Sequence, residues 1–270
     1  MFPTSLLKVM AFLGVWAIIW LPIAFFVARL INWQPNKPLV PQQKLILLAS
    51  LYILIPPIMW WKIHQEGLSF AAIGWQWQFN LLLSLGLGLF IAVVGLILVF
   101  SLESWLGLIT WQWSQSKVLL TSICPIFLLS LAIGGIEELI FRGYIFSVLT
   151  VDYSLGLAAI ASSIIFALLH LIWERKETIP QIPGLWLMGM ILVGARLADN
   201  GSLGLAWGLH AGWIWGLSCL DTAELITYTD NSKNWLIGIN QQPLAGVAGI
   251  LCLLFTGVVL WWLSPALTYL

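Results

Sequence analysis

Long uncharged runs, separated by short polar segments, dominate the chain. The first run extends over Val9–Ala28 and the second over Leu45–Trp61, with the polar, proline-containing segment 32–43 between them. Runs of this kind approach the ~20 apolar residues that a helix needs to cross a bilayer. Prolines at 35, 38 and 41 cannot lie inside a continuing helix, so the pattern predicts two separate spans. Pro56-Pro57 predicts a kink in the second span.

The same pattern predicts six further spans. They are Leu81–Phe100, Val118–Val151, Leu155–Trp173, Gly184–Ala198, Ser202–Leu220 and Leu244–Leu263. The segment 118–151 is too long for one crossing, since its helix would extend about 51 Å against a hydrocarbon core of about 30 Å. We therefore expect Pro125 or Gly134-Gly135 to break or kink it.

Composition agrees with this pattern, with 61% hydrophobic residues, 8% charged residues and a mean hydropathy of +0.98. The predicted fold class is all-α, a polytopic membrane protein with about eight transmembrane helices. Zero net charge gives no long-range field that would favour nucleic acid. Cys124, Cys219 and Cys252 lie in apolar segments without CxxC or metal-ligand spacing, which speaks against a disulfide framework or a cysteine metal site.

Basic residues outside segment 134–143 favour one orientation in the membrane. With eight spans, three lie on one side and seven on the other: Lys8, Lys62 and Arg196 against Arg29, Lys37, Lys44, Lys117, Arg175, Lys176 and Lys233. The positive-inside rule makes the second side cytoplasmic and places both termini outside.

The chemistry of the chain is concentrated in segment 118–151, where Glu137, Glu138 and Arg142 are the only charged side chains. Each costs roughly 2.5–3.5 kcal/mol at the centre of a lipid-facing helix, and ionisable residues there usually mark function. On a helix Glu138 and Arg142 share a face, whereas Glu137 is turned by about 100° from its neighbour. Glu138 can be neutralised by Arg142, but the extra carboxylate is difficult to justify as a purely structural ion-pair cluster.

Two of the three histidines lie in predicted spans. His64 is expected to be solvated in a charged loop with Lys62 and Glu66, whereas His170 lies near the end of the fifth span and His210 in the middle of the seventh. A lone histidine in an apolar helix is often a satisfied core residue. Two of them, in the same membrane as a surplus glutamate, make a common pocket with Glu137 geometrically possible, opening towards the cytoplasm.

These residues form three ordered motifs, which are Glu137-Glu138-x-x-x-Arg142, Phe166-x-x-x-His170, and His210-Ala211 in a helix that follows Ser202-Leu203. In this order they resemble the CAAX protease and bacteriocin-processing enzyme (CPBP) family of intramembrane proteases, which includes the Ras-converting type of CAAX endopeptidase. The resemblance covers roughly Leu119–Leu220. It implies a single integral membrane domain, 1–270, with N-terminal spans in 1–117, a catalytic core in 118–220 and a C-terminal span in 244–263.

The resemblance also implies a glutamate-dependent endopeptidase without a cofactor, acting on a peptide or membrane-protein substrate that can be lipid-modified. Glu137 would be the general base and His170 would bind and polarise the water. Glu138 and Arg142 would order the site. From the residues themselves, the glycines of the sixth span, Gly184, Gly189 and Gly194, are candidates for an opening that admits water.

The third motif departs from the family pattern. The family commonly has His-x-x-x-Asn or His-x-x-x-Asp, a pair that stabilises the oxyanion, but the fourth position after His210 is Ile214. Loss of one oxyanion donor typically costs a factor of about 10² to 10³ in rate. Either His210 acts alone, or an indole N–H of Trp213 or Trp215 replaces the missing donor.

Three alternatives stay open at this stage. A zinc site of two histidines and two carboxylates is disfavoured because HExxH is absent and adjacent glutamates are poorly spaced as ligands. Ile214 favours a non-catalytic scaffold or pseudoprotease on the same fold. A proton-coupled transporter would use the same buried groups, but the sequence shows no inverted repeat.

Overall fold

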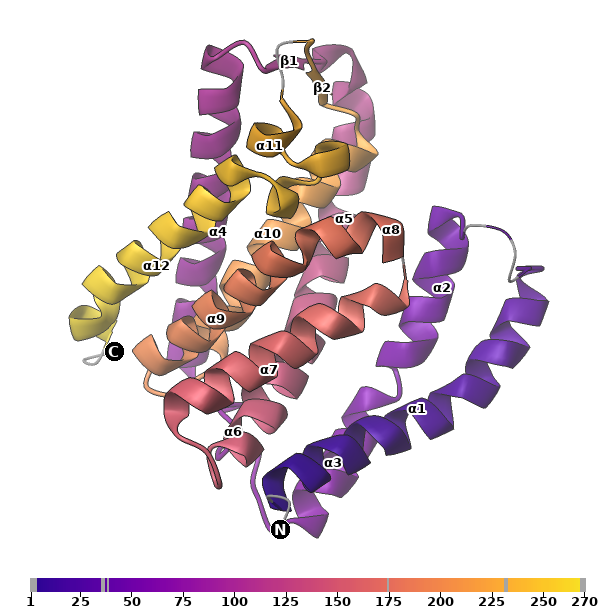
Figure 1. Cartoon of the computed structure of the whole chain (residues 1–270), viewed down its shortest axis with the longest axis vertical. Coiled ribbons are helices and arrows are strands. Elements are labelled where there is room, and N and C mark those ends of the chain that lie inside the picture. The colour runs from indigo at the N-terminus through magenta and orange to yellow at the C-terminus, as the bar shows by residue number, and fades with distance from the viewer. Residues whose placement is uncertain (1–3, 35–36, 38, 174, 231–232, 268–270) are drawn as a thin grey trace.

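The computed structural model describes residues 4–34, 37, 39–173, 175–230 and 233–267, and it is almost entirely helical (Figure 1). Its helices are α1 (Thr4–Leu30), α2 (Pro41–Tyr52), α3 (Ile55–Gln65), α4 (Phe79–Trp105), α5 (Ser116–Glu138), α6 (Phe146–Leu149), α7 (Leu155–Leu169), α8 (Arg175–Thr178), α9 (Ile182–Ala198), α10 (Gly204–Thr222), α11 (Asn234–Ile237) and α12 (Val247–Leu267). A π-helix, η2 (Leu139–Ile145), joins α5 to α6, and a 3-10 turn, η3 (His170–Ile172), follows α7. Pro35 and Pro38 of the predicted first connection lie outside the described residues.

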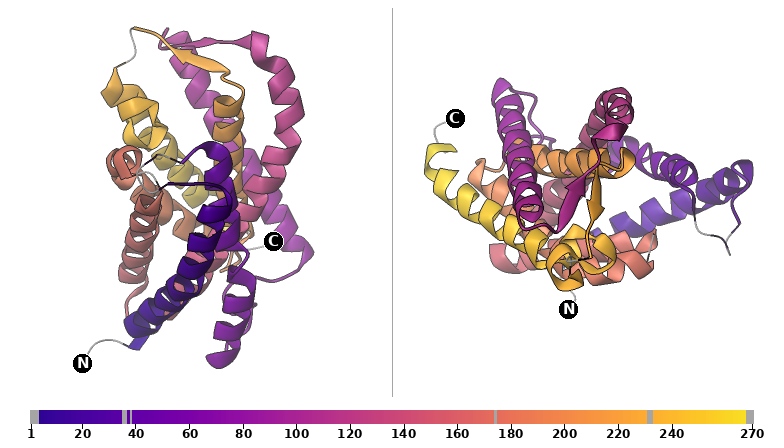
Figure 2. Two further views of the ribbon diagram at one scale, coloured as in Figure 1. Left: turned by 90° about the vertical axis from the view of Figure 1, so that its right-hand side faces the viewer. Right: turned by 90° about the horizontal axis from the view of Figure 1, so that it is seen from above.

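Two short strands were not predicted. Strands β1 (Ile109–Trp111) and β2 (Ile226–Tyr228) pair antiparallel, with Ile109 opposite Tyr228. They connect the loops that follow α4 and α10, at the top of the molecule in Figures 1 and 2. The chain's N-terminus lies at the opposite end of the molecule.

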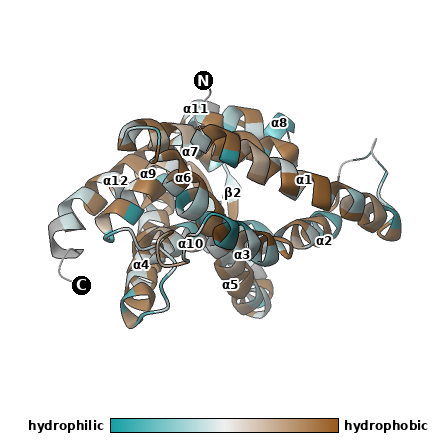
Figure 3. Cartoon of the chain, turned by 90° about the horizontal axis from the view of Figure 1, so that it is seen from below, coloured by the Kyte–Doolittle hydropathy of each residue, from teal (hydrophilic) through white to brown (hydrophobic). Residues whose placement is uncertain are grey.

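Seven segments of the described residues are long and apolar enough to cross a membrane, and they coincide with seven of the eight predicted spans. These are Thr4–Leu30, Pro41–Gln65, Phe79–Trp105, Lys117–Leu149, Leu155–Ile172, Arg175–Ala198 and Val247–Ser264. Large apolar side chains such as Ile18, Phe90 and Trp261 are exposed on α1, α4 and α12, which suits contact with lipid. Figure 3 draws most of α1 in the colours of hydrophobic residues. The chain is an all-α polytopic membrane protein.

The remaining predicted span, Ser202–Leu220, is α10, which is helical as expected but lies among other helices. It packs along α4 and α5. Glycines repeat every four residues on its surface, and a Cβ at Gly208 would lie 2.1 Å from the carbonyl oxygen of Leu85. A Cβ at Gly88 of α4 would likewise lie 2.3 Å from the carbonyl oxygen of Leu205. Small residues at this spacing let two membrane helices approach closely, so α4 holds α10 in the centre of the fold.

The expected break at Pro125 or Gly134-Gly135 is wrong. The helix passes through both positions and changes only to π-helical geometry at Leu139. The two glycines serve packing instead, because a Cβ at Gly135 would lie 2.8 Å from the Trp207 ring and one at Gly134 would lie 3.1 Å from the Ala211 nitrogen. Helix α10 therefore approaches α5 immediately before the two glutamates.

The kink predicted in the second span is a break that precedes the prolines. Helix α2 ends at Tyr52, and α3 begins at Ile55 with Pro56 in its first turn. Proline is tolerated in the first turn because the N–H that it lacks would have no intrahelical partner there. The break places Tyr52 in the interior of the span Pro41–Gln65.

The sequence suggested a solvated, charged loop around Lys62 and Glu66. In the structure these residues lie at the C-terminal end of α3 and contact each other. Glu66 accepts hydrogen bonds from Lys62 at 2.8 Å and from the Tyr144 hydroxyl at 2.6 Å, and Lys8 lies 3.3 Å away. His64 is exposed as predicted, with its ring 4.8 Å from that of Trp60. Glu66 thus ties α1, α3 and the π-helix together on one side of the molecule.

This cluster predicts acid-sensitive stability. Burial acts to raise the pKa of Glu66, but the hydrogen bonds from Lys62 and Tyr144 and the charge of Lys62 outweigh it and lower the pKa. Since the folded pKa is depressed, the stabilisation is present above the unfolded value of about 4.3 and is lost as pH falls through the folded value. Glu66→Gln should lower Tm at pH 7 and flatten the dependence of Tm on pH between about 5 and 3.

Tryptophan-fluorescence melting in detergent measures this effect. Glu177→Gln is the matched control, because Glu177 is exposed on α8. A Glu66→Gln protein whose Tm and acid dependence equal those of the parent would contradict the assignment.

Candidate active site

The two glutamates end α5, and the π-helix begins at the next residue. All seven residues of this π-helix, Leu139–Ile145, are buried. A π-helical turn leaves carbonyls poorly matched to the α-helical ladder, and such turns are frequent at functional sites. Arg196 of α9 donates to the Arg142 carbonyl and, at 2.9 Å, to the Ser147 hydroxyl. Sequence reasoning missed this role of Arg196, although an arginine inside an apolar run is itself a signal.

Glu138 forms the expected pair with Arg142. Both side chains are buried, and Arg142 Nη1 donates to Glu138 Oε1 at 3.0 Å. His210 Nδ1 lies 2.7 Å from the same oxygen. The Arg142 guanidinium also lies 4.3 Å from the centre of the Phe166 ring. Glu138 is therefore a shared acceptor that joins η2 to α10.

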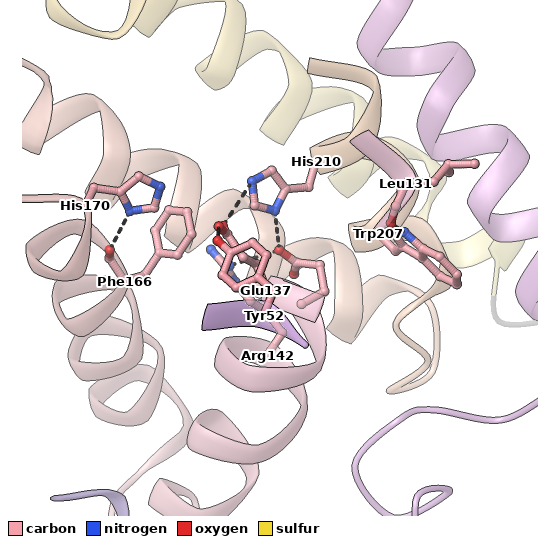
Figure 4. A network of polar contacts seen from close by, with 9 residues as sticks. Tyr52, Leu131, Glu137, Arg142, Phe166, His170, Trp207 and His210 are labelled. Atoms are coloured by element: carbon pink, nitrogen blue, oxygen red, sulfur yellow. Dashed lines mark hydrogen bonds and ion pairs between the residues drawn. The ribbon is translucent and has the colours of Figure 1, made fainter. Parts of the chain in front are cut away.

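Glu137 points away from that pair, as predicted, but it is not without partners. The Tyr52 hydroxyl donates to Glu137 Oε1, and His210 Nε2 lies 3.6 Å from Oε2 (Figure 4). Tyr52 comes from α2, so the contact joins two spans far apart in the sequence.

His210 lies between the two carboxylates. Its Nδ1 faces Glu138 and its Nε2 faces Glu137, and its side chain is almost completely buried. The contact of Nδ1 with Glu138 is of hydrogen-bond length at 2.7 Å, whereas Nε2 lies 3.6 Å from Glu137, which is longer than a hydrogen bond. With both ring nitrogens directed at carboxylates, His210 holds the pair of glutamates in place from the side of α10.

His170 approaches Glu137 from another direction. Its Nδ1 lies 2.8 Å from the Phe166 carbonyl oxygen, and its ring stands edge-on to the Phe166 ring at 4.6 Å. A carbonyl only accepts hydrogen bonds, so Nδ1 carries the proton. In the neutral ring Nε2 is then the nitrogen that can accept one.

Glu137 and His170 line one cavity of about 560 Å³. Side chains of α1, α2, α5 and the turn after α7 form its walls, most of them apolar, and the Tyr52 side chain belongs to them. Lys44, Thr178 and Gln181 are polar residues of the same lining. The cavity thus combines a mostly apolar wall with a few polar side chains and the ionisable groups Glu137 and His170.

The predicted opening at the glycines of the sixth span is wrong. Among the described residues, α9 contributes no side chain to the wall of this cavity. A Cβ at Gly184 would lie 2.1 Å from the Leu244 carbonyl oxygen, and one at Gly189 would lie 2.7 Å from Ser163 Cβ. These two glycines therefore permit close packing of α9 against its neighbours.

The residues considered for the oxyanion do not gather at the cavity. Trp215 Nε1 donates to the Ile123 carbonyl at 3.1 Å, so this indole is occupied on α5. Within the part of the chain that the structure describes, Trp213, Ile214 and His210 are not wall residues of the cavity. In the same part, no group of three or more His, Cys, Asp or Glu side chains is arranged to hold a metal ion.

Residues 118–216 match the family model described as type II CAAX prenyl endopeptidase Rce1-like. This part of the chain is similar to the Rce1-like family. The Rce1-like domain contains Glu137, Glu138, Arg142, His170 and His210, whereas Tyr52 lies before it. The similarity supports an intramembrane protease at the level of the family. No curated protein and no solved structure matches the chain.

Proposed function

We propose that the protein is an intramembrane endopeptidase in which Glu137 and His170 activate a water molecule. The observation that carries the proposal is that these two side chains, from different helices, line the same cavity. The remaining ionisable groups, Glu138, Arg142 and His210, form a buried network behind Glu137. In a shared cavity the carboxylate can accept a proton from a nucleophilic water, and the imidazole can serve as the second hydrogen-bond partner of that water.

In the proposed reaction Glu137 is the general base. Its carboxylate takes one proton from the water while the water oxygen attacks the carbonyl carbon of the scissile peptide bond. His170 Nε2 accepts a hydrogen bond from the same water and orients it. The tetrahedral intermediate then collapses, the C–N bond breaks, and protonated Glu137 returns the proton to the leaving amine.

The network behind Glu137 orders the site. Arg142 and His210 both contact Glu138, and His210 also faces Glu137, so the two carboxylates keep fixed orientations. The sequence suggested His210 as an oxyanion donor. Its contacts favour positioning of the glutamates instead, because both of its ring nitrogens face carboxylates.

We propose a lipid-modified or membrane-embedded peptide as the substrate, entering from the cytoplasmic side. The apolar wall formed by α1 and α2 suits a hydrocarbon chain, and the polar lining residues Lys44 and Gln181 suit a peptide backbone. Lys44 lies on the side that the positive-inside rule makes cytoplasmic.

Paired synthetic peptides test this function. The purified protein in liposomes is given two peptides of one sequence, one with a prenylated cysteine and one with a free cysteine, and new termini are identified by mass spectrometry. We expect cleavage of the prenylated peptide and none of either peptide by Glu137→Gln. Binding of the prenylated peptide without new termini would favour a non-catalytic scaffold.

His170 provides a further prediction. His170→Ala should lower kcat by about 10²- to 10⁴-fold, because the water loses its second hydrogen-bond partner. His64→Ala is the matched control, since His64 is exposed and lies outside the cavity wall. Initial rates of peptide cleavage measure the effect, and equal rates in the two variants would contradict the assignment.

A further inference from the structure

We infer that Tyr52 is the oxyanion donor of this enzyme and replaces the polar residue that the family pattern places where Ile214 stands. The inference rests on the proposed function, because an oxyanion exists only if a peptide bond is attacked. It adds to the site a residue from α2, outside the Rce1-like domain 118–216.

The first step is that the other candidates are occupied or wrongly placed. His210 contacts Glu138 through Nδ1 at 2.7 Å, and its side chain is not part of the cavity wall. The Trp215 indole donates to the Ile123 carbonyl. Ile214 has an aliphatic side chain and cannot donate. A protease without another donor would therefore leave the developing charge unsupported in an apolar cavity.

The second step is the position of Tyr52. Its side chain is part of the cavity wall together with Glu137 and His170. Its hydroxyl contacts Glu137 Oε1, so it lies one hydrogen bond from the proposed base. A carbonyl attacked by a water that Glu137 holds must lie next to that base. The Tyr52 hydroxyl is thus within reach of the atom that becomes the oxyanion.

The third step is how the sequence puts a hydroxyl there. Helix α2 stops at Tyr52, and α3 restarts at Ile55 with Pro56 in its first turn. The tyrosine is therefore the last residue of α2, inside the apolar span Pro41–Gln65. Its hydroxyl meets the Glu137 carboxylate of α5 there.

The fourth step is the timing of the hydrogen bond. At rest the Tyr52 O–H donates to the Glu137 carboxylate. When Glu137 takes the proton of the water, its charge disappears and it becomes a weaker acceptor, while the substrate carbonyl oxygen becomes an anion. Rotation about the Tyr52 Cζ–O bond transfers the hydrogen bond to this oxygen. The proton stays on Tyr52, and the bond returns to Glu137 after the amine has left.

A merely structural Tyr52 would act only through Glu137. Loss of its hydroxyl would then shift the pH profile of kcat, but the plateau of kcat would still reach the parent value. An oxyanion donor predicts a different profile. The plateau of kcat stays low at every pH, because the missing donor acts on the transition state.

The experiment compares the parent protein with Tyr52→Phe and with Tyr153→Phe, a control tyrosine outside the cavity wall. We expect Tyr52→Phe to lower the plateau of kcat by about 10² to 10³, with KM within about twofold of the parent. A phosphonate peptide, which mimics the tetrahedral oxyanion, should lose affinity by a similar factor, whereas the uncleaved substrate analogue should not. Melting temperatures of all three proteins verify folding.

The outcomes separate this role from the proposed function. A parent that cleaves peptides, with a Tyr52→Phe plateau within about threefold, would overturn the role of Tyr52 and leave the protease intact. Recovery of the parent kcat at another pH would also overturn it, since Tyr52 would then be a positioning residue. A parent that neither cleaves peptides nor binds the phosphonate would overturn both.

Discussion

Glu137→Gln is expected to abolish most peptide cleavage, with kcat reduced by about 10²- to 10⁴-fold. An amide has nearly the shape of a carboxylate but cannot accept the proton of the attacking water. The Tyr52 hydroxyl can still donate to the amide oxygen, so the contact between α2 and α5 is retained. The variant should therefore melt near the parent temperature, and its loss of activity should appear in kcat with little change in KM.

Steady-state cleavage of a prenylated peptide in liposomes measures this prediction. Glu177→Gln is the control. Glu177 is exposed on α8, and its substitution removes the same charge from the chain. Cleavage by Glu137→Gln within about tenfold of the parent rate would show that another group is the base.

Arg142→Met should produce the largest loss of stability. Arg142 and Glu138 are both almost fully buried, with a nitrogen–oxygen distance of 3.0 Å. Removing one partner of a buried ion pair leaves an uncompensated charge, which typically costs about 3–5 kcal/mol. The Glu138 carboxylate would keep the contact with His210 but lose the guanidinium beside it, and the Phe166 ring would lose the guanidinium above it.

The double variant Glu138→Gln with Arg142→Met gives the matched comparison. It removes both charges, so a large part of the lost stability should return even though activity stays low. Unfolding in a detergent denaturant series measures the free energy of unfolding of all three proteins. Equal stability of the single and double variants would show that the pair contributes little.

Part of the site was predictable because it depends on local geometry. Glu138 and Arg142 are four residues apart, and this spacing places them on one face of a helix whatever surrounds it. The π-helix after Glu138 preserves this contact. The outward turn of Glu137 follows from the same geometry.

Other parts of the site depend on contacts between helices distant in the sequence. Tyr52 is one tyrosine in a long apolar span, and nothing in its neighbourhood distinguishes it from a lipid-facing residue. In the sequence Arg196 counted only as a basic residue that sets the orientation in the membrane, yet its side chain donates to the backbone of the π-helix. The glycines at 134 and 135 resembled a helix break, yet they make room for α10.

The sequence by itself determined that the chain is an all-α membrane protein, where its spans lie, and which segment resembles a protease. These properties are local, since a bilayer requires long apolar helices and penalises every charge within them. The tertiary structure decided which groups meet Glu137, that the cavity lies beside α1 and α2, and that His210 stands outside its wall. The reason is that each helix can turn any of its faces inward, and only the packing of small residues between α4, α5 and α10 selects one arrangement.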